Sequence, residues 1–327
     1  MKIHVINDLL SFKEIFEKYN LKKKDLNFYQ TFEFISSYSE YYKKKLHIYL
    51  IEEKNNYIIL PLNLFKFKFI NYFGFIGSPD ISEENNIIHN FKSFNEFSSI
   101  MNYFFSKENK KFFFLNLKNG FFNDYLLKNN SFYNHLILKS NTVDLTKEYY
   151  VNKKSYLNEI LYSERRFKKE FKNNISILNI NFEEAEKFGV FNFIRNNHKY
   201  KNFKISKIIN FYKKMLNLNL IKISLLKSHN DILSVIIYIS HLGKIYYLIP
   251  VYNEKLFKFS FGKMHLSKLL SFSEDKIKSI FLGPGEEPYK KKFISKNDEL
   301  FFYSNSKILK SYYETKIFLN ETFKKIN

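Results

Sequence analysis

The run of residues from Gly283 to Lys290 is the most distinctive stretch of this sequence and combines several reactive side chains with scarce Gly and Pro. It reads Gly-Pro-Gly-Glu-Glu-Pro-Tyr-Lys and holds two of the eight Gly and two of the five Pro of the whole chain. Clustered Gly and Pro predict a turn with specified, unusual backbone dihedrals after a strand over residues 278–282. Two carboxylates (Glu286, Glu287), a phenol (Tyr289) and an ammonium (Lys290) fall within this run. Such a group can bind and deprotonate an amine, and a charged structural turn is the alternative.

A second candidate site is the turn Ser260–Met264, which reads Ser-Phe-Gly-Lys-Met. Leucines at helical spacing follow it, so the sequence predicts a helix over residues 262–272 with Ser260 as its cap. The first N–H groups of a helix are unpaired and its N-terminal end is positive, which suits a pyrophosphate. Gly262 would let the backbone approach that anion, and Lys263 would add charge. An ordinary capped helix is the alternative.

The elements around these turns form a meander in the second half of the chain. Strands are predicted over residues 221–226, 232–239 and 245–251, because each run is rich in β-branched and aromatic residues and polar turns separate them. Apolar residues at helical spacing between Ile205 and Leu216 predict a helix before the meander. The helix over residues 262–272 follows it.

The first half of the chain repeats this order more faintly. Its patterns predict helices over residues 32–42, 94–105 and 122–127 and strands over residues 46–52, 57–64, 69–75, 112–117 and 132–138. The order helix, hairpin, strand, helix, strand occurring twice indicates a duplicated domain. The predicted fold class is therefore α/β, with modules over residues 1–150 and 151–327. Each module is expected to be a mixed, mostly antiparallel sheet flanked by helices.

The run Gly283–Lys290, closed by Phe293, closely resembles the terminal motif of the CelD/BcsL-like acetyltransferases. That family belongs to the GNAT superfamily and is related in architecture to the FemAB aminoacyl transferases. The similarity covers residues 155–293, where three further stretches agree with the family in order and spacing: Ser163–Lys169, Phe193–Tyr200 and Phe259–Leu266. The chain departs from the pattern at Phe261, where the family has Pro, and at Phe281, near which the family has Asp.

The resemblance implies two tandem GNAT-like modules and an acyl-CoA-dependent N-acyltransferase. Acetyl-CoA or another acyl-CoA would be the co-substrate, and the acceptor would be an amine, with an amino sugar of envelope polysaccharide biosynthesis favoured. The site residues fall into three groups. We expect the cofactor to be bound by Ser260, Gly262, Lys263 and Met264. The expected catalytic residues are Glu286, Tyr289 and His198. The expected substrate-binding residues are Arg166, Glu287 and Lys290.

Two of these residues stand out by their type. Arg166 is one of only three Arg among 53 basic residues, and a chain that favours Lys this strongly retains Arg where a planar fork is needed. A solvated helix face is the alternative. His198 has a side chain that titrates near neutral pH and suits a general base, against the alternative of a polar residue at a helix end.

Composition excludes several other classes of site. The chain has no Cys, which rules out a thiol nucleophile, a Cys-ligated metal and a disulfide framework, and its eight His lack metal-ligand spacing. The net charge of +21 is carried almost wholly by Lys, whereas Arg is preferred for reading bases, so we expect no specific DNA partner. Neither a signal peptide nor a transmembrane segment is evident, and a cytoplasmic location is expected.

Two alternatives stay open, one within the enzyme class and one from a different class. The first is a FemAB-like transfer of an aminoacyl group from tRNA to a cell-wall precursor, which a basic surface would suit. The second is a degenerate, non-catalytic binding module, consistent with the changed positions Phe261 and Phe281. Binding of acyl-CoA or of tRNA would separate these alternatives.

Overall fold

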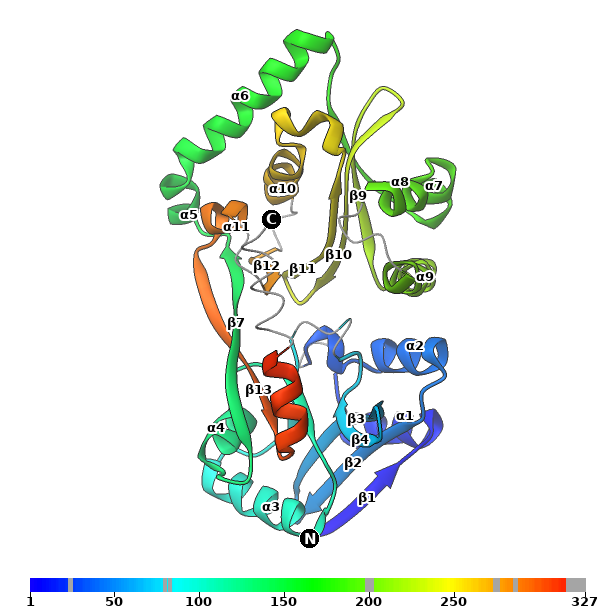
Figure 1. Cartoon of the computed structure of the whole chain (residues 1–327), viewed down its shortest axis with the longest axis vertical. Helices are drawn as coiled ribbons and strands as arrows, with labels where there is room; N and C mark the ends of the chain where they lie inside the picture. Colours follow the sequence, from blue (N-terminus) through cyan, green and yellow to red (C-terminus); the bar gives the residue numbers. More distant parts are fainter. Residues whose placement is uncertain are drawn as a thin grey trace. The chain divides into compact units, whose positions relative to one another are not determined.

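The computed structural model describes residues 1–22, 26–78, 81, 84–197, 203–272, 277–284 and 288–315, which divide into two compact units (Figure 1). The first unit is Met1–Leu138 together with the described residues from Glu299 onward, and the second is Lys139–Asp298. Two long strands, β7 (Tyr133–Asp144) and β13 (Lys296–Ser304), run from one unit into the other.

An antiparallel sheet begins the first unit, with the strand order β1–β2–β3–β4 and with β5 paired to β3. Its strands are β1 (Lys2–Ile6), β2 (Leu46–Glu53), β3 (Asn56–Phe67), β4 (Ile70–Phe75) and β5 (Ile88–His89). Two-residue turns join β2 to β3 and β3 to β4. Further along, β6 (Phe113–Leu117) pairs antiparallel with the second half of β13.

Helices cover both faces of the first unit's sheet (Figure 1). α1 (Leu9–Lys18) and α2 (Phe32–Tyr42) lie on one side, and α3 (Phe94–Lys107) and α4 (Phe121–Lys128) lie on the other. Aromatic rings fill the core beneath α3 and α4, including those of Tyr49, Phe75, Phe97, Phe104, Phe114 and Phe122. The high aromatic content of the chain is thus used to build a core, since rings bury large apolar areas.

The second unit holds strands in the order β8–β9–β10–β11–β12–β7. Their bounds are β8 (Ser176–Ile180), β9 (Lys222–Ser228), β10 (Asp231–His241), β11 (Lys244–Tyr252) and β12 (Ser279–Pro284). Leu242 and Gly243, both with positive φ, form the two-residue turn between β10 and β11, as a tight hairpin requires. All neighbours are antiparallel except β11 and β12, which are parallel and so need a crossover connection.

That crossover contains η3 (Glu254–Phe259) and α10 (Phe261–Phe272). α10 lies with α6 (Lys154–Phe171) on one face of the sheet, and α7 (Phe182–Lys187), α8 (Val190–Asn197) and α9 (Phe203–Asn217) lie on the other (Figure 1). Two short helices, α5 (Lys147–Asn152) and α11 (Pro288–Phe293), complete the unit. The core under α10 includes Tyr238, Tyr247, Leu266, Leu270 and Leu282.

The predicted α/β class is confirmed: two units are present, and each has a mostly antiparallel sheet flanked by helices. The division between them differs from the predicted modules of 1–150 and 151–327. The first unit ends at Leu138, and residues from Glu299 onward return to it. The reason is a long-range pairing, because β13 pairs with β6 and the helix over residues 307–315 packs on Ile70 and Phe113.

Candidate functional site

An opening between β11 and β12 is the central feature of the second unit's sheet. The parallel register runs through only three pairs and ends at Tyr246 opposite Phe281. β11 nevertheless continues to Tyr252, and β12 continues to Pro284. Because the two strands stop pairing while both continue, backbone groups at their carboxyl ends face a gap in the ladder. Open α/β sheets bind ligands at the carboxyl ends of their strands.

A β-bulge in β11 lies beside this opening. β10 and β11 pair Tyr238 with Tyr247 and Ile237 with Ile249, so Leu248 is an extra residue with no opposite number on β10. A bulge bends the strand and increases its twist, which separates it from its neighbour. Pro250, two residues on, cannot donate to a ladder and suits a strand that is open on one side. The peptide group of Leu248 therefore falls outside the registers of both neighbouring strands.

The turn that enters α10 differs in detail from the predicted cap. η3 stands between β11 and α10, and Ser260 follows it with a left-handed backbone (φ 54°), whereas a usual N-cap lies in the β region. The N–H of Ser260 donates to the carbonyl of Phe257, and its own carbonyl accepts from Met264 N at 3.0 Å. The N–H groups of residues 261–263 precede that bond and form the positive end of a 12-residue helix.

The predicted cofactor residues take different places around this turn. Gly262 and Lys263 are partly exposed in its first turn. A Cβ on Gly262 would lie 3.2 Å from Cδ1 of Tyr252, so the glycine lets the end of β11 approach the helix. Met264 is buried in the core and donates its N–H to Ser260. Met264 therefore supports the turn from inside and does not belong to a ligand surface.

Arg166, which was predicted to bind the substrate, lies beside the turn that enters α10. Its guanidinium carbon is 5.5 Å from the ring centre of Phe259, the last residue of η3. Glu164, two residues before Arg166 on α6, forms ion pairs with Lys268 of α10 at 3.0 Å and with Lys168 at 3.2 Å. Burial alone would raise the pKa of Glu164, but the hydrogen bonds and charges of the two lysines lower it. This ion-pair network ties α6 to α10.

The Gly283–Lys290 run begins as predicted at the end of β12. Gly283 has φ +75°, which favours glycine, and its carbonyl accepts from Asn141 Nδ2 of β7 at 3.2 Å. Lys290 is buried in α11 instead of forming part of a solvated charge run. Tyr289 belongs to the first turn of α11, and its side chain is not described. Glu286, Glu287 and His198 lie outside the described residues.

Comparison with known proteins gives likeness in fold only. No family model and no curated protein matches the chain. A conserved protein of unknown function from Bacteroides thetaiotaomicron is similar over 93% of this chain and 99% of its own, with 8% identity and a TM-score of 0.58. The C-terminal domain of a putative lysylphosphatidylglycerol synthetase from Agrobacterium fabrum is similar over 86% and 89%, with 9% identity and a TM-score of 0.56. FemX is similar over 82% and 90%, with 10% identity and a TM-score of 0.53.

These three likenesses each cover more than four fifths of the chain and show that it shares its fold with these proteins. They do not test the resemblance to CelD/BcsL-like acetyltransferases, which stays a prediction.

His265 is a site residue that sequence reasoning passed over. It is fully buried on α10, with Nδ1 3.0 Å from Ser234 Oγ and Nε2 2.9 Å from Ser224 Oγ. Ser234 already donates its hydroxyl proton to the carbonyl of Val251, so Nδ1–H donates to Ser234 and Nε2 accepts from Ser224. Burial lowers the pKa of His265 to about 3. A neutral imidazole therefore fastens α10 to β9, β10 and, through Ser234, β11.

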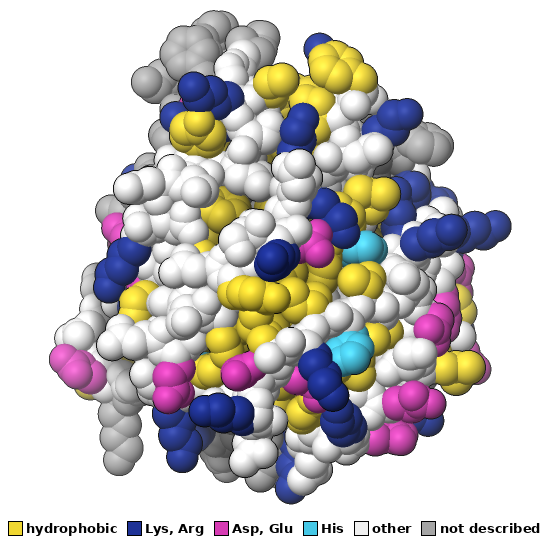
Figure 2. Space-filling model, turned by 90° about the horizontal axis from the view of Figure 1, so that it is seen from below, with side chains coloured by type: hydrophobic (Ala, Val, Ile, Leu, Met, Phe, Trp, Pro, Cys, Tyr) yellow, Lys and Arg dark blue, Asp and Glu magenta, His cyan; other side chains and the backbone are white. Residues whose placement is uncertain are grey.

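Three further observations concern surface charge, metal ligands and membrane-spanning helices. On the face shown in Figure 2, Lys and Arg side chains alternate with Asp and Glu around a central hydrophobic area, with no continuous basic track. Among the described residues, no group of three or more His, Cys, Asp and Glu could hold a metal ion. Within the same residues, no helix is both long and apolar enough to cross a bilayer.

Proposed function

We propose that the second unit is an acyl-CoA-dependent N-acyltransferase acting on an amine. The observation that carries this proposal is the opening between β11 and β12, flanked by the Leu248 bulge and by the turn into α10. β11 continues beyond the last pair with β12 and supplies a strand edge, and the helix end supplies a positive terminus. A long thioester with a pyrophosphate has both an amide-rich arm and an anion that match these two features.

The donor binds with its pyrophosphate at the N–H groups of residues 261–263. Ser260, Gly262 and Lys263 surround that anion, and Arg166 adds charge from α6. The amide groups of the pantetheine arm pair with the carboxyl end of β11, as an added strand would. The thioester carbonyl then lies beside the N–H of Leu248, which the bulge leaves outside the ladder.

The reaction is acyl transfer through a tetrahedral intermediate. The amine nitrogen attacks the thioester carbon and forms the C–N bond, the C–S bond breaks, and the thiolate leaves with the electron pair. The Leu248 N–H stabilises the oxyanion. Glu286 takes the proton from the amine, Tyr289 returns one to the thiolate, and His198 is the alternative base. Glu287 and Lys290 are close in sequence to Glu286 and Tyr289, and they bind the acceptor.

An amino sugar of envelope polysaccharide biosynthesis is the acceptor that we favour, on the resemblance of the Gly283–Lys290 run. That run follows β12, whose carboxyl end lies at the opening. An acceptor on this side would meet the thioester from the end opposite to the pyrophosphate.

A second candidate function is aminoacyl transfer from tRNA. Two observations favour it: the likeness in fold to FemX and to a putative lysylphosphatidylglycerol synthetase domain, and the net charge of +21. The same opening and oxyanion donor would serve an aminoacyl ester, whose carbonyl is attacked in the same way. The two candidates differ in the leaving group, in the molecule that carries it and in the acceptor.

A thermal-shift titration separates them. A ligand that binds only the folded state adds about 2.7 kcal/mol of stability at 100 times its dissociation constant, which raises the melting temperature by several degrees. Acetyl-CoA should produce that rise, and ATP, which has phosphates but no pantetheine arm, should not. A rise with charged tRNA and none with any acyl-CoA would reverse the ranking. An equal rise with ATP would show a general anion site and count against the acyl-CoA proposal.

A further inference from the structure

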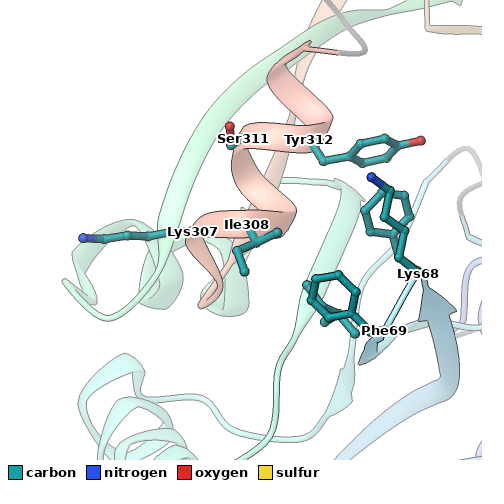
Figure 3. A pocket seen from close by; sticks show the side chains of 8 residues that line it. Lys68, Phe69, Lys307, Ile308, Ser311 and Tyr312 are labelled. Atoms are coloured by element: carbon teal, nitrogen blue, oxygen red, sulfur yellow. The ribbon is translucent and has the colours of Figure 1, made fainter.

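An open apolar groove lies on the first unit, whereas the residues of the proposed transfer site belong to the second. It has a volume of about 470 Å³ and lies between the tip of the β3–β4 hairpin and the helix over residues 307–315 (Figure 3). The lining residues are Phe67, Lys68, Phe69, Ile70, Lys307, Ile308, Ser311 and Tyr312. Figure 3 shows Ile308 and Tyr312 directed from the helix toward the hairpin, with Phe69 and Lys68 opposite.

The helix over residues 307–315 has two apolar faces, and one of them is largely exposed. Leu309 and Tyr313 pack into a core cluster with Ile70 and Phe113. Ile308 is 52% exposed and Tyr312 is 44% exposed, and their spacing of four residues places them together on another face. A surface helix normally presents charged or polar residues there. Tyr312 packs on Phe67 of β3 with ring centres 4.0 Å apart, so part of this face stabilises the unit, whereas Ile308 stays 52% exposed.

The hairpin tip breaks two local rules at once. Lys68 has a left-handed backbone (φ 51°), at a turn position where glycine or asparagine is preferred. The next residue, Phe69, is 80% exposed. Lysine takes the same left-handed backbone in the β2–β3 turn at Lys54, so the exposed aromatic ring of Phe69 is what points to a function at this tip.

The charge of the residues around the groove indicates an anionic partner. The described residues that line the groove include two lysines and no carboxylate. Lys68 stands at the hairpin tip, and Lys307 extends from the helix on the side away from the hairpin (Figure 3). We infer that the groove and the tip form a docking surface for a bilayer that contains anionic phospholipids. Phe69 and Ile308 enter the headgroup region, Tyr312 lies at its polar boundary, and Lys68 and Lys307 contact lipid phosphates.

This inference does not depend on the proposed acyl transfer, because it uses only residues of the first unit. Each lysine near an anionic membrane contributes about 1 kcal/mol, which is about fivefold in partitioning. Removing the Phe69 ring, which would be partly buried in the bilayer, should weaken vesicle binding about tenfold. Added salt should weaken the lysine contribution and leave the aromatic contribution.

The absence of Trp from the chain allows a clean reporter. In Phe69→Trp, the new indole is the only one, and its emission can be followed with vesicles of phosphatidylcholine alone or with about 30% phosphatidylglycerol. We expect a blue shift, and quenching by brominated lipid, with the anionic vesicles only. The matched control is Leu10→Trp on α1, because Leu10 is 77% exposed but does not line the groove. Its emission should stay that of an indole in water.

Vesicle co-sedimentation of unlabelled variants gives the magnitudes. Phe69→Ser should reduce binding about tenfold, and Lys68→Gly, which also relieves the left-handed backbone, about fivefold. Lys307→Gln should match Lys68→Gly, while Leu10→Ser and Lys13→Gln should bind as the unchanged protein does.

Three outcomes would overturn the inference. Unchanged Trp emission with anionic vesicles would show that the tip does not meet lipid. Equal binding to both kinds of vesicle would remove the role of the lysines. A blue shift without lipid that grows with protein concentration would make the groove a contact between two copies of the chain.

Discussion

The buried His265 on α10 makes the second unit sensitive to mild acid. Its ring is fully enclosed and both nitrogens are already bonded to serine hydroxyls, so the folded chain has no place for a second ring proton. The unfolded chain has no such restriction. Replacing His265 by Gln keeps a neutral side chain with a donor and an acceptor but removes the titration.

The size of the effect follows from the two pKa values of His265, 6.5 in the unfolded chain and about 3 in the folded one. Because the folded pKa is depressed, the contribution to stability is complete above pH 6.5 and is lost as the pH falls toward 3. The free energy of unfolding should fall by about 1.4 kcal/mol per pH unit, or about 2 kcal/mol between pH 6.5 and about pH 5. Carboxyl groups titrate mainly below that window.

Urea unfolding at a series of pH values measures this difference, with circular dichroism as the signal. His47 and His89, whose pKa values burial also lowers, stay in both proteins and cancel in the comparison. His265→Gln should be about 1–3 kcal/mol less stable at pH 8, because its hydrogen bonds fit less well, and its loss of stability toward acid should be shallower.

Equal slopes for the two proteins between pH 6.5 and about pH 5 would refute the reasoning. They would mean that His265 takes up a proton in the folded state, or that the unfolded chain does not. Proton NMR offers a direct check, since the His265 ring signals of the folded protein should not shift as the pH is lowered through this range.

Three other predictions concern the proposed transfer. Gly262→Val should weaken acyl-CoA binding, and Tyr252→Ala in the same chain should not restore it; restored affinity would mean that the glycine serves only the 3.2 Å approach of that ring. Glu286→Gln and Tyr289→Phe should each lower turnover by roughly ten- to a thousand-fold with little change in cofactor affinity, and full turnover in both would make the run a structural turn. Arg166→Ala should raise the dissociation constant of acyl-CoA more than Arg166→Lys does, as isothermal titration would show.

Local patterns were sufficient to predict the meander that builds the site. The predicted strands at residues 232–239 and 245–251 became β10 and β11, and the predicted helix at 262–272 became α10 within one residue. Each has an unbroken apolar pattern and a polar turn at its end. The strand at 278–282 was predicted from the same kind of pattern and became β12.

The pairing of the strands could not be predicted from the sequence, because it depends on residues that are far apart along the chain. Nothing local distinguishes a β12 that lies beside β11 from one at an edge, and the three-pair register that creates the opening is a property of both strands. The strands β1, β8 and β13 were missed for a related reason. They lack the alternation of buried and exposed residues that marks a strand: no residue of β1 is buried, and only one of five is buried in β8. His265 was missed because its two serine partners lie 31 and 41 residues away.

The two departures from the family pattern are explained by the core and do not by themselves favour a degenerate module. Phe261 is buried against Phe167, with ring centres 5.2 Å apart, so its side chain points away from the exposed side of the α10 turn. Phe281 is buried against Tyr246 at 5.8 Å, at the last pair before β11 and β12 separate. Phe261 contributes only its backbone to the proposed anion site, and Phe281 sets where the opening begins. A chain with these residues should therefore still bind acyl-CoA. Binding without any single-turnover transfer to amines would be the result that favours a degenerate module.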